Sequence, residues 1–333
     1  MGADEFIVTR PKDFREFWDR AIKIVDGCDP EISVEKWEQE DPNFEDEYIL
    51  DGRGRKQAQD VNPFDLRWDS HVIVTGLTIH RVRFLSYDGR EVGGLLQRPR
   101  YSGKKDFPAI VHFAGYGGEV LIDSDLVSSG YAVFNFSHRG MLMGSRGFDR
   151  YSPVPLLVQG IETPESYVYR SIVIDCLLAV KILSKLGNID AGRMATVGTS
   201  QGGALSIATA SLNPGVKAVA ADLPWLADFS ILAGAGSDGP NNELKEYLRR
   251  SPKKAGNVAR TLGYFDAASF AEFLTCPAFL SLGQDDPVAP AAAVRNLHSR
   301  IPVEKLLLEI PRMGHERSTL FRFLARQWFD FFV

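Results

Sequence analysis

Short apolar runs alternate with helical patterns from residue 108 to the end of the chain, and this alternation constrains the fold more than any other feature. It is typical of βαβ units, which build a mostly parallel sheet with helices on its faces. We therefore expect an α/β protein. The runs are PAIVHFA (108–114), YAVFNF (131–136), RMATVG (193–198), VKAVAAD (216–222), PAFLSLG (277–283) and KLLLEI (305–310).

The section before these runs has a different period. From His71 to Pro99 apolar and polar residues alternate as they do in β-strands, and Asp88-Gly89 is typical of a hairpin turn. We expect two or three strands here. They would form an antiparallel edge of the larger sheet.

Two further signals predict helices. Thr163-Pro164-Glu165 combines an N-cap residue, a proline and an early acid, and the apolar positions that follow repeat at helical spacing until Gly187. No strand-like run occurs between about residues 225 and 275. That stretch is predicted to be a small helical insertion between two strands, and such an insertion can form a cap.

Residues 1–75 are predicted to be an extension packed on a catalytic domain of residues 76–333. The extension carries helical patterns over 12–24 and 34–40. Residues 31–51 hold nine acidic side chains and one lysine. Blocks of like charge are usually solvated surface; a lid or an oligomer contact is the alternative.

Composition excludes several classes of partner. The 333 residues are 44% hydrophobic, which is enough for one large core, and the net charge is only −5, with no run of Lys or Arg. We expect no nucleic-acid partner and no membrane partner.

The chain shows no apolar stretch of about 20 residues and no signal-peptide pattern at its start, so a cytoplasmic location is expected. Its three cysteines are expected to be buried thiols rather than a disulfide framework or a metal site.

Gly198-Thr199-Ser200-Gln201-Gly202 is the main motif with chemical meaning. It follows an apolar run directly and precedes the helical stretch ALSIATASL. This is the context of a nucleophile elbow, where Gly198 and Gly202 leave room for a tight turn that exposes the serine hydroxyl. The alternative is an ordinary glycine-rich turn with an N-cap serine.

A serine nucleophile needs a base and an acid that orients the base. Asp286 follows the run at 277–283 and His315 follows the run at 305–310, in the order Ser, Asp, His that the α/β-hydrolase fold uses. Asp286 is preferred to Asp285 because Gly283, Asp286 and Pro290 match the spacing G-x-x-D-x-x-x-P of this turn. Structural roles are expected for most of the other five histidines.

An acyl-transfer site also needs donors for the oxyanion. The amide of Gln201, directly after the nucleophile, is one candidate. The second is the amide of Tyr116 in the glycine-rich stretch after residue 114. A turn without a ligand role and a tyrosine ring that faces the substrate are the alternatives there.

Taken together, these residues resemble the acetyl xylan esterases and cephalosporin C deacetylases. The resemblance is carried by RPKDFREFWDRAI near the start, GYGGE (115–119), SSGYAVFNFSHRG (128–140), GTSQGG (198–203), DLPWL (222–226), TLGYFDAASFA (261–271) and MGHE (313–316). It implies an α/β-hydrolase that removes acetyl or other short acyl groups from sugar hydroxyls and similar alcohols. It also implies no metal and no organic cofactor, and a homo-oligomer, because family members commonly form ring-like hexamers.

The resemblance implies Ser200, Asp286 and His315 as the triad and Tyr116 and Gln201 as the oxyanion hole. The chain departs from the family pattern at Met141, where Arg139-Gly140 is usually followed by glutamine. Arg139 remains as a structural support. The acidic composition of residues 31–70 is a second departure.

Pro224 and Trp225 come just after the run at 216–222, where they could wall the acyl site and favour acetyl over long chains. A buried place among the insertion helices is the alternative for Trp225. Two other functions stay open at this point. One is a serine peptidase or amidase on the same fold, and the other is a binding protein that has kept the fold without catalysis.

Overall fold

A computed structural model describes residues 6–36, 76–100, 103, 105–117, 122–140, 154–234 and 239–333. Most of the acidic segment, the proposed boundary at residue 75, His71 and Met141 lie outside these ranges.

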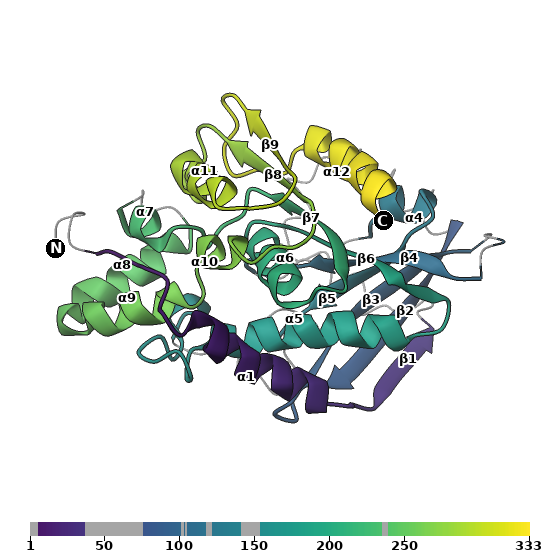
Figure 1. Cartoon of the computed structure of the whole chain (residues 1–333), viewed down its shortest axis with the longest axis horizontal. Helices are drawn as coiled ribbons and strands as arrows, with labels where there is room; N and C mark the ends of the chain where they lie inside the picture. The colour runs from purple at the N-terminus through teal and green to yellow at the C-terminus, as the bar shows by residue number, and fades with distance from the viewer. Residues whose placement is uncertain are drawn as a thin grey trace, which may run out of the picture.

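One sheet forms the centre of the molecule (Figure 1). In the described residues its strand order is β1-β2-β3-β5-β4-β6-β7-β8-β9, with β4 to β9 parallel and β1 to β3 antiparallel. The strands are β1 (Ile32–Lys36), β2 (Leu77–Leu85), β3 (Glu91–Pro99), β4 (Phe107–Phe113), β5 (Ala132–Ser137), β6 (Ile189–Thr199), β7 (Val216–Asp222), β8 (Ala278–Gly283) and β9 (Lys305–Ile310). All six predicted strand runs after residue 108 are confirmed.

The predicted hairpin is also confirmed. Strands β2 and β3 pair antiparallel up to Leu85 and Glu91. The turn between them closes with a hydrogen bond from the Gly89 amide to the Ser86 carbonyl, and Gly89 has φ +79°. A positive φ is easy only for glycine, which explains why this turn reads Asp-Gly.

The helix predicted over residues 34–40 is wrong in its described part. Val34 to Lys36 belong to strand β1, which pairs antiparallel with β2, with Val34 opposite Val82. On this strand Glu35 forms an ion pair with Arg83. The backbone groups of β2 need partners along this edge, and that tertiary pairing overrides a weak local helical pattern.

Helices cover both faces of the sheet. The larger core lies on the side of α1 (Phe14–Gly27), α5 (Val168–Lys185), α6 (Gln201–Leu212), α10 (Ala267–Ala271) and α11 (Ala291–Ser299). The smaller core lies under α4 (Ser124–Ser128) and α12 (Thr319–Phe332). Adjacent residues of a strand point to opposite faces, so that Val111 enters the first core and Ile110 the second.

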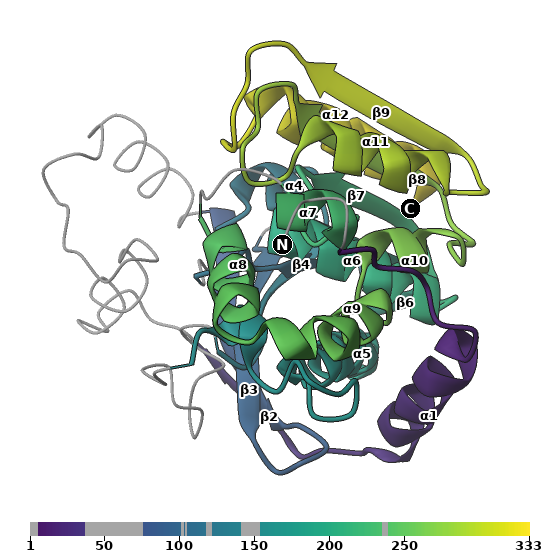
Figure 2. The same cartoon turned by 90° about the vertical axis from the view of Figure 1, so that its left-hand side faces the viewer.

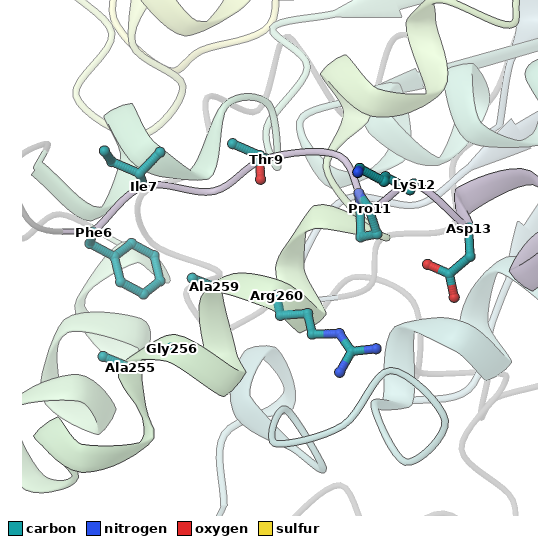
Figure 3. Close-up of a pocket in the computed structure, with 10 residues that line it drawn as sticks. All are labelled: Phe6, Ile7, Thr9, Pro11, Lys12, Asp13, Ala255, Gly256, Ala259 and Arg260. Atoms are coloured by element: carbon teal, nitrogen blue, oxygen red, sulfur yellow. The ribbon is translucent and has the colours of Figure 1, made fainter.

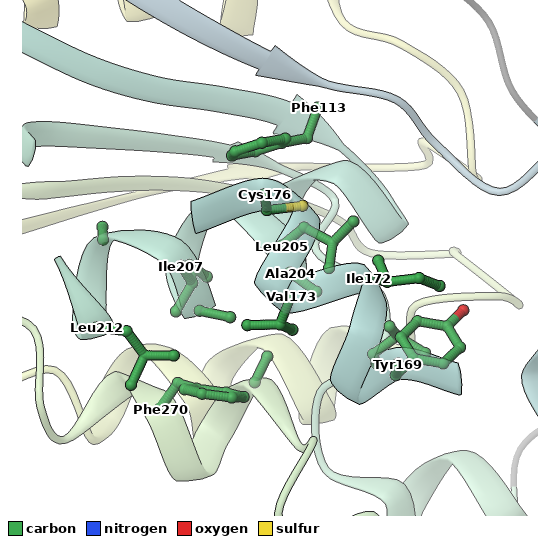
Figure 4. Close-up of a cluster of buried hydrophobic side chains, with 14 of the residues drawn as sticks. Phe113, Tyr169, Ile172, Val173, Cys176, Ala204, Leu205, Ile207, Leu212 and Phe270 are labelled. Carbon is green, nitrogen blue, oxygen red and sulfur yellow. The ribbon is translucent and has the colours of Figure 1, made fainter. Parts of the chain in front are cut away.

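Figure 4 shows part of the larger core, around α5 and α6. Phe113 from β4, Cys176 from α5, Leu205 from α6 and Phe270 from α10 all belong to this core. All four are buried. Burying a large apolar side chain stabilises a fold by about 1.5–3 kcal/mol, so α6, which begins directly after Ser200, is firmly held.

Helix α5 begins later than predicted. Thr163 does not start it; its hydroxyl accepts a hydrogen bond from the Ser166 amide at 3.3 Å in a separate turn. Gly160 (φ +68°) precedes this turn, and a side chain there would be 2.0 Å from the Ser166 carbonyl oxygen. Thr163, the predicted N-cap residue, is therefore part of this turn, and α5 starts at Val168. Its end at Lys185 agrees with the prediction.

The predicted helical insertion is present between β7 and β8 (Figure 2). It contains α7 (Phe229–Gly234), α8 (Asn241–Arg250), the 3-10 turn η3 (Pro252–Lys254), α9 (Ala255–Gly263) and α10. A second 3-10 turn, η2 (Leu156–Val158), lies beside α8. Helix α1 is tied to the insertion because Trp18 Nε1 donates to the Tyr264 carbonyl at 3.0 Å. None of the described helices is long and apolar enough to cross a membrane.

Candidate active site

Ser200 lies in a tight turn between β6 and α6. Its backbone has φ +59° and ψ −120°, a combination that residues with side chains rarely adopt. A Cβ on Gly202 would be 2.0 Å from the Phe113 carbonyl oxygen, and a Cβ on Gly198 would be 2.4 Å from the carbonyl carbon of Gly202. Both positions therefore require glycine, as the elbow pattern predicts.

The structure brings the three predicted triad residues together. His315 Nε2 lies 2.8 Å from Ser200 Oγ, and His315 Nδ1 lies 2.8 Å from Asp286 Oδ2. The three residues follow β6, β8 and β9, so they meet at the edge where these parallel strands end. This is the edge where open α/β sheets bind ligands.

Asp286, rather than Asp285, faces the histidine. Asp286 is buried and its Oδ1 accepts hydrogen bonds from the amides of Val288 and Ala289, each at 2.8 Å. Asp285 is exposed to solvent. Two main-chain donors leave Oδ2 free to hold the His315 ring in one orientation.

The two predicted oxyanion residues flank the serine. Gln201 is the first residue of α6, and the first amides of a helix have no acceptor within the helix. Tyr116 belongs to the loop of residues 114–117 after β4, here called the oxyanion loop. The Phe113 and Ala114 carbonyls pack directly against Gly202, which sets this loop beside the elbow.

The side chain of Gln201 enters a buried polar network that sequence reasoning missed. Its Oε1 accepts from the Tyr169 hydroxyl at 2.5 Å, and its Nε2 donates to His138 Nε2 at 2.9 Å. His138 Nδ1 lies 2.7 Å from the Arg139 carbonyl and donates to it. Burial lowers the pKa of His138 to about 4, so the ring is neutral near pH 7 and both of its nitrogens are satisfied.

Tyr116 is tied to the helical insertion. Its hydroxyl lies 2.9 and 2.8 Å from the two carboxylate oxygens of Glu243 on α8 and accepts from the Leu157 amide at 3.3 Å. Its ring meets Trp225 edge to face, with centroids 5.4 Å apart. Sequence reasoning missed Glu243, since nothing in the sequence relates residue 243 to residue 116.

Pro224 and Trp225 lie behind the elbow. Both are buried, and Trp225 has no exposed surface. The Trp225 amide donates to the Ser200 carbonyl at 3.0 Å, and its Nε1 donates to Asn241 Oδ1 at 2.8 Å. The structure shows Trp225 buried against the insertion helices, and the role of Pro224 and Trp225 as a wall of the acyl site stays a prediction.

Asp222 is a second carboxyl group near the elbow that was missed as a functional candidate. The Ser200 amide donates to its carbonyl at 2.8 Å, and its carboxylate accepts from the hydroxyls of Ser281 and Thr199. Burial raises the pKa of Asp222 to about 6. Asp222 ends β7 and opens the stretch DLPWL (222–226), and this position could have marked it as a candidate from the sequence.

Arg139 occupies a structural position. Its guanidinium pairs with Asp175 of α5, with Nε 2.7 Å from Oδ2, and with Asp88 of the hairpin turn, with Nη1 2.6 Å from Oδ2. It therefore joins the end of β5 to α5 and to the β2–β3 hairpin. The supporting role near the elbow that the resemblance implies stays a prediction.

A pocket of about 550 Å³ lies elsewhere, between the N-terminal segment and α9 (Figure 3). Phe6 and Arg260 are among its lining residues, and none of the triad residues is. In the described part of the chain, no cluster of three or more His, Cys, Asp or Glu side chains could hold a metal ion.

Comparison with known proteins decides the family. The model of the family described as acetyl xylan esterase (AXE1) matches residues 56–331. The chain belongs to the acetyl xylan esterase family. This membership confirms the predicted family resemblance.

One relative of this family member is acetyl esterase Axe7A of Xylanibacter ruminicola. The two sequences are 30% identical over 174 residues. This match covers 52% of the present chain and 38% of Axe7A. The chain thus spans well under half the length of that relative.

Solved structures give the fold. Acetyl xylan esterases from Paenibacillus sp. R4 and Thermoanaerobacterium sp. JW/SL YS485 superpose with TM-scores of 0.80 and 0.77 at 22% identity. The first similarity covers 99% of this chain and 98% of the other, and the second covers 98% and 96%. The predicted α/β-hydrolase fold is therefore confirmed.

Proposed function

We propose that the protein is a serine carboxylesterase that removes acetyl or other short acyl groups from sugar hydroxyls or cephalosporin-like alcohols. The observation that carries the proposal is the hydrogen-bonded series from Ser200 through His315 to Asp286 on a strand-to-helix elbow. A serine hydroxyl is a weak nucleophile near neutral pH, and a neighbouring imidazole held by a carboxylate is the arrangement that activates it.

In the proposed first step, Ser200 Oγ attacks the ester carbonyl carbon and its proton passes to His315 Nε2. The carbonyl electron pair moves onto oxygen, and the Gln201 and Tyr116 amides donate hydrogen bonds to that oxyanion. The intermediate then collapses, the bond between the acyl carbon and the alcohol oxygen breaks, and His315 returns the proton to the leaving alcohol.

In the second step a water molecule attacks the acyl-Ser200 ester. His315 accepts a proton from the water, and collapse of the second intermediate returns that proton to Ser200 Oγ and releases the carboxylic acid. Asp286 holds the ring and stabilises its charged form in both steps. The scheme balances with water alone, so no metal and no organic cofactor form part of the proposal.

The relatives support a short acyl group, since they are acetyl and acetyl xylan esterases. A peptidase or amidase has weaker support. A puromycin hydrolase superposes with a TM-score of 0.57 over 74% of this chain at 19% identity, a likeness in fold alone. The family resemblance also leads us to propose a homo-oligomer, a hexamer by that resemblance, which light scattering in solution would test.

The test of the proposed function is covalent labelling combined with product release. We expect an organophosphate to label one site per chain, and peptide mapping to place the label on Ser200. We also expect acetate release from acetylated xylo-oligosaccharides or cephalosporin C, lost in Ser200→Ala.

The outcomes separate the alternatives. Comparable rates on p-nitrophenyl acetate and p-nitroacetanilide would favour the amidase, whereas a large ester preference supports the proposal. A folded protein that is neither labelled nor active would favour the binding protein.

A further inference from the structure

The oxyanion loop is held at its tip by residues that lie far away in the chain. The Tyr116 hydroxyl lies within 2.9 Å of both carboxylate oxygens of Glu243, which belongs to the first turn of α8. The Leu157 amide lies 3.3 Å from the Tyr116 hydroxyl and 3.3 Å from Glu243 Oε2. These three groups form a closed polar triangle between the loop, η2 and α8.

The same turn of α8 also reaches the opposite side of the site. Asn241 Oδ1 accepts from Trp225 Nε1 at 2.8 Å, and Asn241 Nδ2 donates to the Val288 carbonyl at 2.9 Å. Val288 belongs to the loop whose amides hold Asp286. The start of α8 therefore contacts the oxyanion loop, the residue behind the elbow and the acid loop.

We propose that Glu243 is a positioning residue of the esterase, because its bond to the Tyr116 hydroxyl fixes the loop that carries the Tyr116 amide, the proposed second oxyanion donor. This inference rests on the proposed function. Glu243 does not touch the reacting atoms; it acts through Tyr116. The loop is otherwise rich in glycine, with Gly115 before Tyr116 and Gly117 (φ +100°) after it.

Burial strengthens this contact. Desolvation raises the pKa of the Tyr116 hydroxyl well above its ordinary value, so the hydroxyl stays a hydrogen-bond donor across the working range of pH. Burial also raises the pKa of the Glu243 carboxyl; in its ionised form this carboxylate accepts a hydrogen bond that contributes about 1.5–3 kcal/mol, more than a neutral one. The loss of a single oxyanion donor lowers turnover by about 10² to 10³, so misplacing the loop has a large effect on rate.

The test compares Tyr116→Phe, Glu243→Ala and Glu243→Gln by steady-state kinetics on p-nitrophenyl acetate. Tyr116→Phe keeps the amide and the ring and removes only the tether. We expect Tyr116→Phe and Glu243→Ala each to lower kcat about 10- to 100-fold, part of the value of one oxyanion donor, with KM changed less than about threefold. Glu243→Gln keeps an acceptor oxygen and should retain most of the activity.

Two further measurements separate positioning from general destabilisation. The inhibition constant of an arylboronic acid, which adds to a serine hydroxyl as a tetrahedral anion, should rise in parallel with the loss of kcat. The double variant Tyr116→Phe with Glu243→Ala should be no slower than the slower single variant, since both remove one interaction.

Tyr247→Phe is the matched control, because Tyr247 lies on the same helix and its hydroxyl bonds Glu162 at 3.0 Å. It should keep kcat within about twofold, as expected for loss of an exposed contact. Unchanged kcat in Tyr116→Phe, or an equal loss in Tyr247→Phe, would overturn the inference. Activity that survives Ser200→Ala would overturn the proposed function instead.

Discussion

The loop that carries Asp286 and the loop that carries Tyr116 are held in different ways. Around Asp286 the contacts come from the main chain: the amides of Val288 and Ala289 donate to its carboxylate, and the Asp285 amide donates to the Met313 carbonyl beside His315. Around Tyr116 the anchor is the side chain of Glu243.

Gln201 follows the pattern of Tyr116, because its side chain depends on Tyr169 and His138. Asp286 is thus held by the backbone of its own loop, whereas the side chains of the two proposed oxyanion residues are held by other side chains. Main-chain contacts survive most substitutions of their neighbours. Side-chain contacts do not, so we expect the oxyanion side of the site to be more sensitive to distant mutation.

The largest loss of activity is expected when Asp286, the acid held by main-chain amides, is itself replaced. Asp286→Asn keeps an oxygen for the two amides but cannot hold His315 in the correct tautomer, and we expect kcat to fall on the order of 10⁴-fold with little change in unfolding temperature. Asp285→Asn is the matched control at the exposed neighbour and should stay near wild-type. Equal losses in both variants would show that the acid was assigned to the wrong residue.

A smaller effect, on folding stability, is expected when a side chain is added at Gly202, where α6 touches the end of β4. In Gly202→Ala the added Cβ would lie 2.0 Å from the Phe113 carbonyl oxygen, so the end of β4 must move. We expect a loss of about 3 kcal/mol or more in the free energy of unfolding, at the upper end for overpacking, measured by urea denaturation. Gly256→Ala in α9 meets nothing within 4 Å and should stabilise by up to about 1 kcal/mol through helix propensity. A neutral Gly202→Ala would contradict the close packing of the elbow.

The smallest expected effect is a loss of folding stability at acidic pH, and it comes from the side-chain network that joins Gln201 to His138. The pKa of His138 is about 4 in the folded protein, because of burial, and about 6.5 when unfolded. The stability that this histidine contributes is complete above pH 6.5 and is lost as the pH falls toward 4, by up to about 3 kcal/mol. His138→Gln can make similar hydrogen bonds without titrating, so the free energy of unfolding of wild-type relative to the variant should fall over this range. A constant difference from pH 7 to pH 4 would rule this out.

Much of the fold was predictable because it depends on local patterns. The six apolar runs after residue 108 became β4 to β9. The motif around Ser200 marked the elbow, where Gly198 is required by its contact with Gly202, four residues along the chain, and Gly202 by its close approach to the Phe113 carbonyl. Asp286 and His315 could be placed because strand ends of a parallel sheet meet at one edge.

The features that could not be predicted from the sequence depend on contacts between residues that are far apart in the chain. Strand β1 forms because β2 offers an unpaired edge, and no pattern within residues 32–36 reports this. Likewise the bond between Tyr116 and Glu243 joins residues 127 positions apart. The buried state of Trp225 depends on Asn241 of a helix whose position the sequence does not specify.

The backbone of Ser200 also affects how the sequence can change over evolutionary time. A residue with a side chain at φ +59° costs about 1–3 kcal/mol, a sizeable part of the net stability of about 5–15 kcal/mol that typical proteins have. A lineage that needs the nucleophile must therefore keep compensating stability in the surrounding sheet, which narrows the set of core substitutions it can accept. A lineage that lost the activity would be free of this constraint, and glycine at position 200 would then be favoured.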